Sequence, residues 1–174
     1  MATTYGDVTI TLFVTQQEIE SFTGLNAATD KYLRPACVMA HTEGLCSIIG
    51  KPLYDAMCQD ITVVSADMLY NIKMYLIFQS AANFAFLSSN KLANFGVVQS
   101  TDEHLQYSEN AQIRTQSFWQ NKADMYTRKI QQGIIKDYAT YRSYIDEAAL
   151  NGMKANLYSF ATCGIWLGGA RHRD

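Results

Sequence analysis

Hydrophobic and polar positions in the first part of the chain predict a short strand followed by a helix. Between residues 8 and 13 the sequence alternates as VTITLF, which is typical of a strand with one buried face. Thr15 and Glu18 then have the spacing of a capping box, in which each side chain binds a free backbone N–H of the first helical turn. We therefore expect a helix over 16–23, ended by Gly24.

The next apolar positions predict two consecutive helices. Residues 30–49 carry apolar side chains at roughly helical spacing, and His41 lies on the same face. If this helix begins at residue 30, Pro35 lies inside it and should bend it. Gly50 ends the helix, and a proline at position 52 suits the first turn of a second helix over 52–59.

The following helix is apolar on most of its circumference. It spans about 66–88, with Ser65 as its cap. A helix of this kind is buried, either in the centre of its own domain or under a neighbouring subunit. Because a small chain has few elements with which to surround a helix, the pattern favours oligomerisation.

The centre of the chain interrupts the helical pattern before the longest helix. Turn-like and short extended sequences predict a small β-hairpin or arm near 92–107. Ser108 then caps a helix over 109–139, which at about 1.5 Å per residue is about 45 Å long. One stripe of this amphipathic helix contains Ile113, Trp119, Tyr126, Ile130, Ile134 and Tyr138.

The last part of the chain predicts a short helix and an extended segment. The helix covers about 140–150 and is stopped by Asn151 and Gly152. Residues 157–167 read as an extended apolar segment, followed by a glycine-rich basic end. This segment either packs as an edge strand of its own core or docks on another chain by adding a strand. The sequence leaves both interpretations open.

Together these elements predict a single, mainly α-helical domain. The fold class is a helical bundle with one long helix, a small β-hairpin or arm and an extended C-terminal segment. A length of 174 residues suits one domain over 1–174, with a helical body at about 15–150 and an arm at about 157–174.

Composition and charge narrow the class of protein. Hydrophobic residues make up 48% of the chain, which excludes a disordered protein. The net charge is −2, which argues against a protein that coats nucleic acid. The first ninety residues are net acidic and the rest net basic. This asymmetry either orients like subunits side by side or reflects a chance distribution of surface charge.

Candidate chemistry is sparse, and we expect no catalytic, cofactor-binding or metal-binding residues and therefore no enzyme. The sequence contains no phosphate-binding glycine loop and no nucleophile elbow. The four cysteines form no C-x-x-C pair and read as small buried residues in a reducing cytoplasm, although a disulfide stays open. Asp146 and Glu147 are neighbours and so point to different helix faces. The lone His41 is expected to be a core histidine.

Two alternative functions remain from the residues alone. A cytosolic helical ligand-binding protein or enzyme would use His41 and the tyrosine-rich core, in a pocket that also contains Tyr75 and a carboxylate. A DNA-binding regulator would use the first helices, whose only cations are Lys31, Arg34 and Lys51. Three cations neutralise few phosphates, which argues against this second alternative.

The order of several short motifs resembles a known family. A helix that ends in Ile49-Gly50 is followed by Leu53-Tyr54, with Met57 in place of the last leucine of a "Leu-Gly-x-x-Leu-Tyr-x-x-Leu" turn. Asn94-Phe-Gly-Val-Val and a final Gly164-Ile-Trp-Leu-Gly-Gly continue the match. The chain is similar to the head–tail connector (adaptor or ring) proteins of tailed bacteriophages, especially those of crAss-like and other Bacteroidetes phages.

This resemblance implies a structural virion protein of the phage neck, made in the host cytoplasm. Such proteins form a homo-oligomeric ring, usually of twelve copies, between portal and tail. The ring extends the DNA channel and offers a docking platform, so the implied partners are the portal protein and the next neck or tail protein. DNA passes through without sequence-specific binding, and neither a membrane nor a cofactor is involved.

Two sets of residues are nominated for these contacts. The resemblance implies that the segment from Gly164 to Gly169 faces the portal, and the neighbouring apolar and basic residues extend this arm. The expected docking residues are Phe160, Gly164, Ile165, Trp166, Leu167, Gly168, Gly169, Arg171 and Arg173. The residues expected to pack between subunits are Trp119, Tyr126, Ile130, Ile134 and Tyr138.

Overall fold

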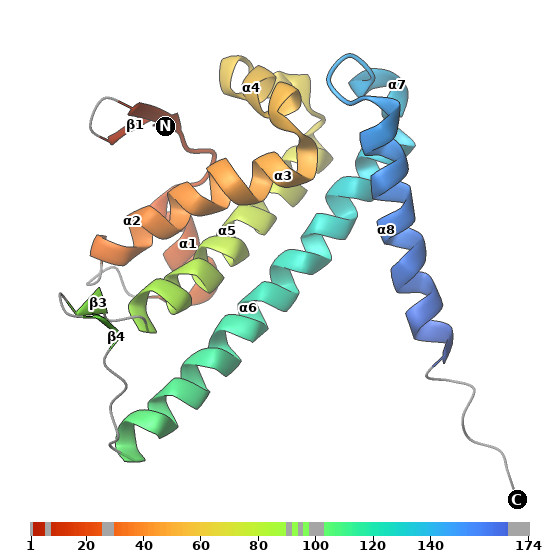
Figure 1. Ribbon diagram of the computed structural model, residues 1–174. Coiled ribbons are helices and arrows are strands. Elements are labelled where there is room, and N and C mark those ends of the chain that lie inside the picture. Colours follow the sequence, from red (N-terminus) through yellow and green to blue (C-terminus); the bar gives the residue numbers. More distant parts are fainter. Residues whose placement is uncertain are drawn as a thin grey trace, which may run out of the picture.

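The computed structural model shows a mainly α-helical protein whose central helix, α5 (Ala66–Ser89), packs against helices that precede it in the chain and against the long helix that follows it (Figure 1). The structure describes the backbone of residues 2–5, 8–25, 30–89, 92–93, 96–97 and 103–166. Side chains are described for residues 11–25, 32–87 and 113–157.

The N-terminal part forms a two-stranded ribbon and a short helix. Strand β1 (Ala2–Tyr5) pairs antiparallel with β2 (Val8–Thr11), and only the second strand was expected from the sequence. Helix α1 (Gln16–Thr23) has the predicted capping box: the Thr15 N–H donates to Glu18 Oε2 at 2.7 Å, and the Glu18 N–H donates to Thr15 Oγ1 at 3.2 Å. This prediction is confirmed.

The predicted helix over 30–49 is present, but its middle is wider than an α-helix. It consists of α2 (Asp30–Met39), the π-helical segment η2 (Ala40–Leu45) and α3 (Cys46–Ile49). Gly50, with φ of 79°, ends this rod. The π-helical segment was not predicted, because apolar spacing does not distinguish a single wide turn.

A short corner leads from this rod to the central helix. It consists of α4 (Lys51–Gln59) and the 3-10 turn η3 (Ile61–Val63). Helix α5 (Ala66–Ser89) follows and packs against α1, α2, η2 and the long helix α6 (Glu103–Lys136) of the same chain. Most of α5 is therefore covered by its own chain rather than by a neighbouring subunit, although Tyr70 and Phe86 are 56% and 45% exposed. Its buried side chains are Met68, Ile72, Met74, Tyr75, Leu76, Ile77, Phe78, Ser80, Ala81, Ala82 and Ala85.

Helix α6 runs antiparallel to α5 and is the longest helix of the described chain, as expected. The Phe78 ring stacks on Trp119 and on Tyr126, with centroids 5.8 and 5.7 Å apart. Beside these rings, Gln79 and Gln120 exchange amide hydrogen bonds of 3.2 and 3.1 Å. The aromatic contacts supply the packing, and the paired amides fix the register of the two helices.

Two very short strands precede α6. They are β3 (Leu92–Ala93) and β4 (Gly96–Val97), which pair antiparallel. Two residues on each side do not establish the predicted hairpin or arm near 92–107, which stays a prediction. Its last part is wrong, because the chain is helical from Glu103 onward.

The C-terminal part differs most from the sequence-based expectation. After α7 (Tyr138–Tyr141), helix α8 runs over Glu147–Trp166 and passes through Asn151 and Gly152 without a break. The predicted helix over 140–150 and the extended segment from 157 are therefore wrong up to residue 166. Asp146 caps α8, since its Oδ1 accepts from the Ala149 N–H at 2.7 Å. The helix formers on both sides of Gly152 (Ala148, Ala149, Leu150, Met153, Lys154 and Ala155) outweigh this glycine, which costs only about 1 kcal/mol.

The aromatic stack between α5 and α6 gives a direct test of this packing. We expect Trp119→Ala to lower the free energy of unfolding by about 3 kcal/mol, because it empties a ring site against Phe78. Urea unfolding followed by circular dichroism measures the change. Trp119→Phe is the matched control and should cost less than half as much, since the buried indole Nε1 has no hydrogen-bond partner to lose. A loss below about 0.5 kcal/mol for the alanine variant would contradict this account.

Candidate interaction surfaces

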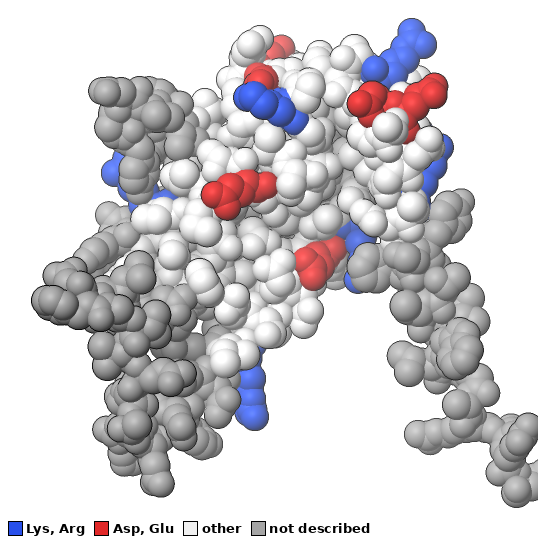
Figure 2. Space-filling model, viewed as in Figure 1, with Lys and Arg blue, Asp and Glu red and all other residues white. Residues whose placement is uncertain are grey.

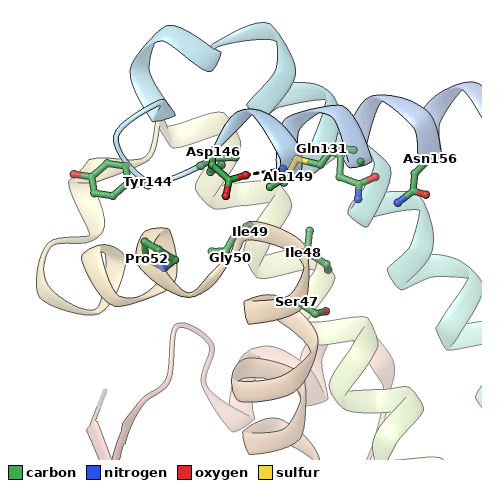
Figure 3. A pocket seen from close by; sticks show the side chains of 13 residues that line it. Ser47, Ile48, Ile49, Gly50, Pro52, Gln131, Tyr144, Asp146, Ala149 and Asn156 are labelled. Carbon is green, nitrogen blue, oxygen red and sulfur yellow. Dashed lines mark hydrogen bonds between the residues drawn. The ribbon is translucent and has the colours of Figure 1, made fainter.

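A pocket of about 380 Å³ lies where the α3–α4 corner faces α8 (Figure 3). Ile49, Ile145 and Met153 line it with buried apolar side chains. Gln131 of α6 and Asn156 of α8 add amide groups. The pocket is therefore apolar in its depth and polar around its rim, which suits a side chain with an apolar stem and a polar or charged tip.

Asp146 is the one charged residue that lines this pocket. One of its carboxylate oxygens caps α8, and its side chain lies above Gly50 in Figure 3. Glu147 is the first residue of α8 and is exposed. Glu147 does not line the pocket itself but adds a second negative charge next to Asp146 in the chain.

Gly152, an interior residue of α8, lines the pocket. The packing of the chain does not require a glycine at this position. A Cβ atom built at this position would have no atom within 4 Å, and Gly152 is not in the positive-φ region. An interior helical glycine costs about 0.5–1 kcal/mol relative to alanine. The missing side chain keeps the pocket open at a small cost in helix stability.

His41 lies outside this pocket and is held inside the core. Its Nε2 accepts from the Phe13 N–H at 3.0 Å, and its Nδ1 donates to the Cys37 carbonyl at 2.7 Å. Burial lowers the pKa of His41 from 6.5 to about 4. The interpretation of His41 as a core histidine is confirmed, because both ring nitrogens are engaged by the backbone.

The alternative pocket of His41, Tyr75 and a carboxylate is not found among the described residues. Neither His41 nor Tyr75 lines the pocket beside α8. Within the described part of the chain, no group of three or more His, Cys, Asp or Glu side chains is placed to hold a metal ion. Among the described residues, no helix is long and apolar enough to cross a membrane.

The stripe expected to pack between subunits belongs instead to the core of its own chain. Tyr126, Ile130 and Ile134 are buried, and both isoleucines have no exposed surface. Trp119 and Tyr138 are half-buried against the same core, and Tyr138 Oη donates to the Ile145 carbonyl at 3.3 Å. The assignment of this stripe to a subunit interface is therefore wrong for the three buried residues, since α5 already covers them.

A different face of α6 is exposed. Phe118 and Met125 are 51% and 41% exposed and alternate along the helix with Lys122 and Lys129. Lys122 Nζ lies 5.7 Å from the Phe118 ring centroid, so the charge and the aromatic ring form one surface. We call these four residues the outer stripe. Their spacing of four, three and four was visible in the sequence, whereas the pocket was not, because it combines distant segments.

The expected docking arm lies partly within α8. Phe160, Gly164, Ile165 and Trp166 belong to this helix, although their side chains are outside the described residues. Leu167, Gly168, Gly169, Arg171 and Arg173 lie outside the described residues altogether. On the face shown in Figure 2, acidic and basic side chains are scattered over the described part, with no continuous basic surface for nucleic acid.

No protein-family model, curated protein or solved structure matches the chain.

The buried histidine predicts a specific sensitivity to acid. The pKa of His41 is lower in the folded than in the unfolded chain, so the unfolded chain binds more protons between pH 6.5 and pH 4. The stabilisation is complete above pH 6.5 and is lost as the pH falls. We expect the free energy of unfolding to drop by about 2 kcal/mol from pH 7 to pH 5.

Urea unfolding at several pH values measures this drop. The matched variant is His41→Gln, whose amide can accept from the Phe13 N–H and donate to the Cys37 carbonyl but does not titrate. Its stability should stay nearly constant over the same interval. An equal drop in the two proteins would assign the acid sensitivity to other groups.

Proposed function

We propose that this chain is a structural virion protein that forms a ring in the neck of a tailed bacteriophage, between portal and tail. The order of the sequence motifs supports the family. In this role the ring of about twelve copies extends the DNA channel, binds the portal and offers a platform to the next neck or tail protein. DNA passes through it without sequence-specific contacts.

The observation that carries the proposal is the course of α8. Its beginning packs on the body through the buried side chains of Leu150 and Met153. The helix then diverges from α6 and continues to Trp166 away from the bundle (Figure 1). Twenty helical residues span about 30 Å, so the end of α8 lies far from the core.

A projecting helix favours a particular way of binding the portal. Residues 157–166 are helical, so they do not offer the extended strand that strand addition needs. We therefore infer that an apolar side of α8 lies in a groove of the portal, as amphipathic helices commonly do. The basic residues Arg171 and Arg173 extend this contact beyond the helix.

The self-contained body supports the same role. Because α5 is covered within one chain, the subunit does not need its neighbours in order to bury its main core. It can fold first and then assemble on a portal that is already in place.

Removing the arm tests the proposal. We expect deletion of residues 160–174 to abolish binding to the portal protein of the same phage, while the free energy of unfolding changes by less than about 1 kcal/mol. Native mass spectrometry of the mixed proteins measures the complex, and circular dichroism follows unfolding. Phe22→Ala removes an exposed aromatic side chain from α1 and should leave portal binding unchanged.

Two results would contradict this expectation in different ways. Failure of the full chain to bind the portal at any stoichiometry would count against the neck function. Loss of the helical signal in the shortened chain would mean that the arm is part of the core.

A further inference from the structure

The two candidate surfaces lie on different sides of α6. Gln131 lines the pocket, whereas Lys122 belongs to the outer stripe. They are nine positions apart, which at 3.6 residues per turn is two and a half turns, so they lie on opposite sides of the helix. Phe118 and Met125 are likewise more than a quarter turn from Gln131. One copy therefore presents the stripe and the pocket in different directions.

The apolar parts of the two surfaces are complementary. Phe118 and Met125 project from a regular helix and leave about half of their surfaces exposed. The pocket offers a hollow floored by Ile49, Ile145 and Met153. An exposed aromatic side chain that enters such a hollow is a common anchor of protein interfaces.

Their charges are complementary as well. The outer stripe carries Lys122 and Lys129, and over residues 113–136 α6 has five Lys or Arg against one Asp. Asp146 lines the pocket and Glu147 follows it in the chain, whereas Lys51, between the lining residues Gly50 and Pro52, is already paired with Asp55 at 3.0 Å. Opposite charges on facing rims favour one orientation of the two partners.

We propose that the outer stripe of one copy docks in the pocket of the next copy. The contact joins two different surfaces of the same chain, so it is head-to-tail and can close into a ring. This inference rests on the proposed function, for which it names the interface between subunits. The subunit interface expected from the sequence used the buried side of α6, and the proposed interface uses the exposed outer stripe instead. The end of α8 stays available to the portal.

Gly152 explains how the pocket stays able to receive a side chain. Gly152 lines the pocket and is exposed, and a Cβ built there meets no atom outside its own stretch of helix within 4 Å, so a longer side chain has room at the pocket without entering the core. The position therefore allows the pocket to be blocked without disturbing the subunit.

The steric test uses Gly152→Leu with Gly152→Ala as its matched control. Sedimentation velocity of the purified full chain, up to millimolar concentration at low salt, measures self-association. We expect the leucine variant to associate at least about tenfold more weakly, and the alanine variant to stay close to the natural chain. Thermal unfolding should show that neither variant is less stable than the natural chain, since both residues favour helix over glycine.

The electrostatic test uses a charge reversal on each side. Lys122→Glu and Glu147→Lys should each weaken association about tenfold, and the chain that carries both should recover most of it. Glu20→Lys changes the charge by the same amount on α1 and should have no effect. Failure of the double variant to recover would overturn the pairing of these two surfaces.

A photocrosslinking amino acid at position 118 identifies what the stripe contacts. In a mixture of light and isotope-labelled chains, crosslinks between copies should join position 118 to residues 47–52 or 144–156. Crosslinks between copies at another surface, or none, would overturn the proposal, as would a monomer at every concentration.

Portal binding by the natural chain is measured separately. If the natural chain does not bind the portal, the neck function is refuted. If the Gly152→Leu variant still forms the same ring, only this interface is refuted.

Discussion

The packing of α5 against α6 is the contact on which the rest of the structure depends. Phe78 stacks between two aromatic side chains of α6, and the amide pair of Gln79 and Gln120 sets the register beside them. These contacts bury most of α5, the most apolar helix of the described chain, within a single subunit. They also determine which side of α6 remains outside, and therefore where the outer stripe lies.

The other side of α5 is covered by α2 and η2, whose geometry departs from a regular α-helix where they contact it. At Gly44, in the π-helical segment, a Cβ would overlap the Tyr75 hydroxyl, so glycine allows the two helices to approach closely. Asn83 Nδ2 donates to the Ala36 carbonyl at 3.2 Å. His41 donates to the carbonyl of the next residue, Cys37, and accepts from the Phe13 N–H of the N-terminal segment. Local departures from regular helix are thus compensated by side-chain hydrogen bonds.

The long helix α6 gives the molecule two separate sets of contacts. One side completes the core, while the opposite side is exposed and carries alternating apolar and basic residues. Near its end α6 supports the beginning of α8, which then leaves the bundle (Figure 1). A subunit built in this way can hold its neighbours through the body and a larger partner through the projecting helix, without using the same residues twice.

The sequence alone determined most helix positions and the capping box at Thr15, because these depend on local spacing and on side chains within one turn. It also identified His41 as a core residue. It failed at Gly152, where one glycine was read as a helix stop although the residues around it favour helix. The covering of α5, the buried side of Ile130 and the pocket beside Asp146 were decided only by tertiary structure. Each depends on which distant segment packs against a helix, and apolar spacing shows that a face is buried without showing what buries it.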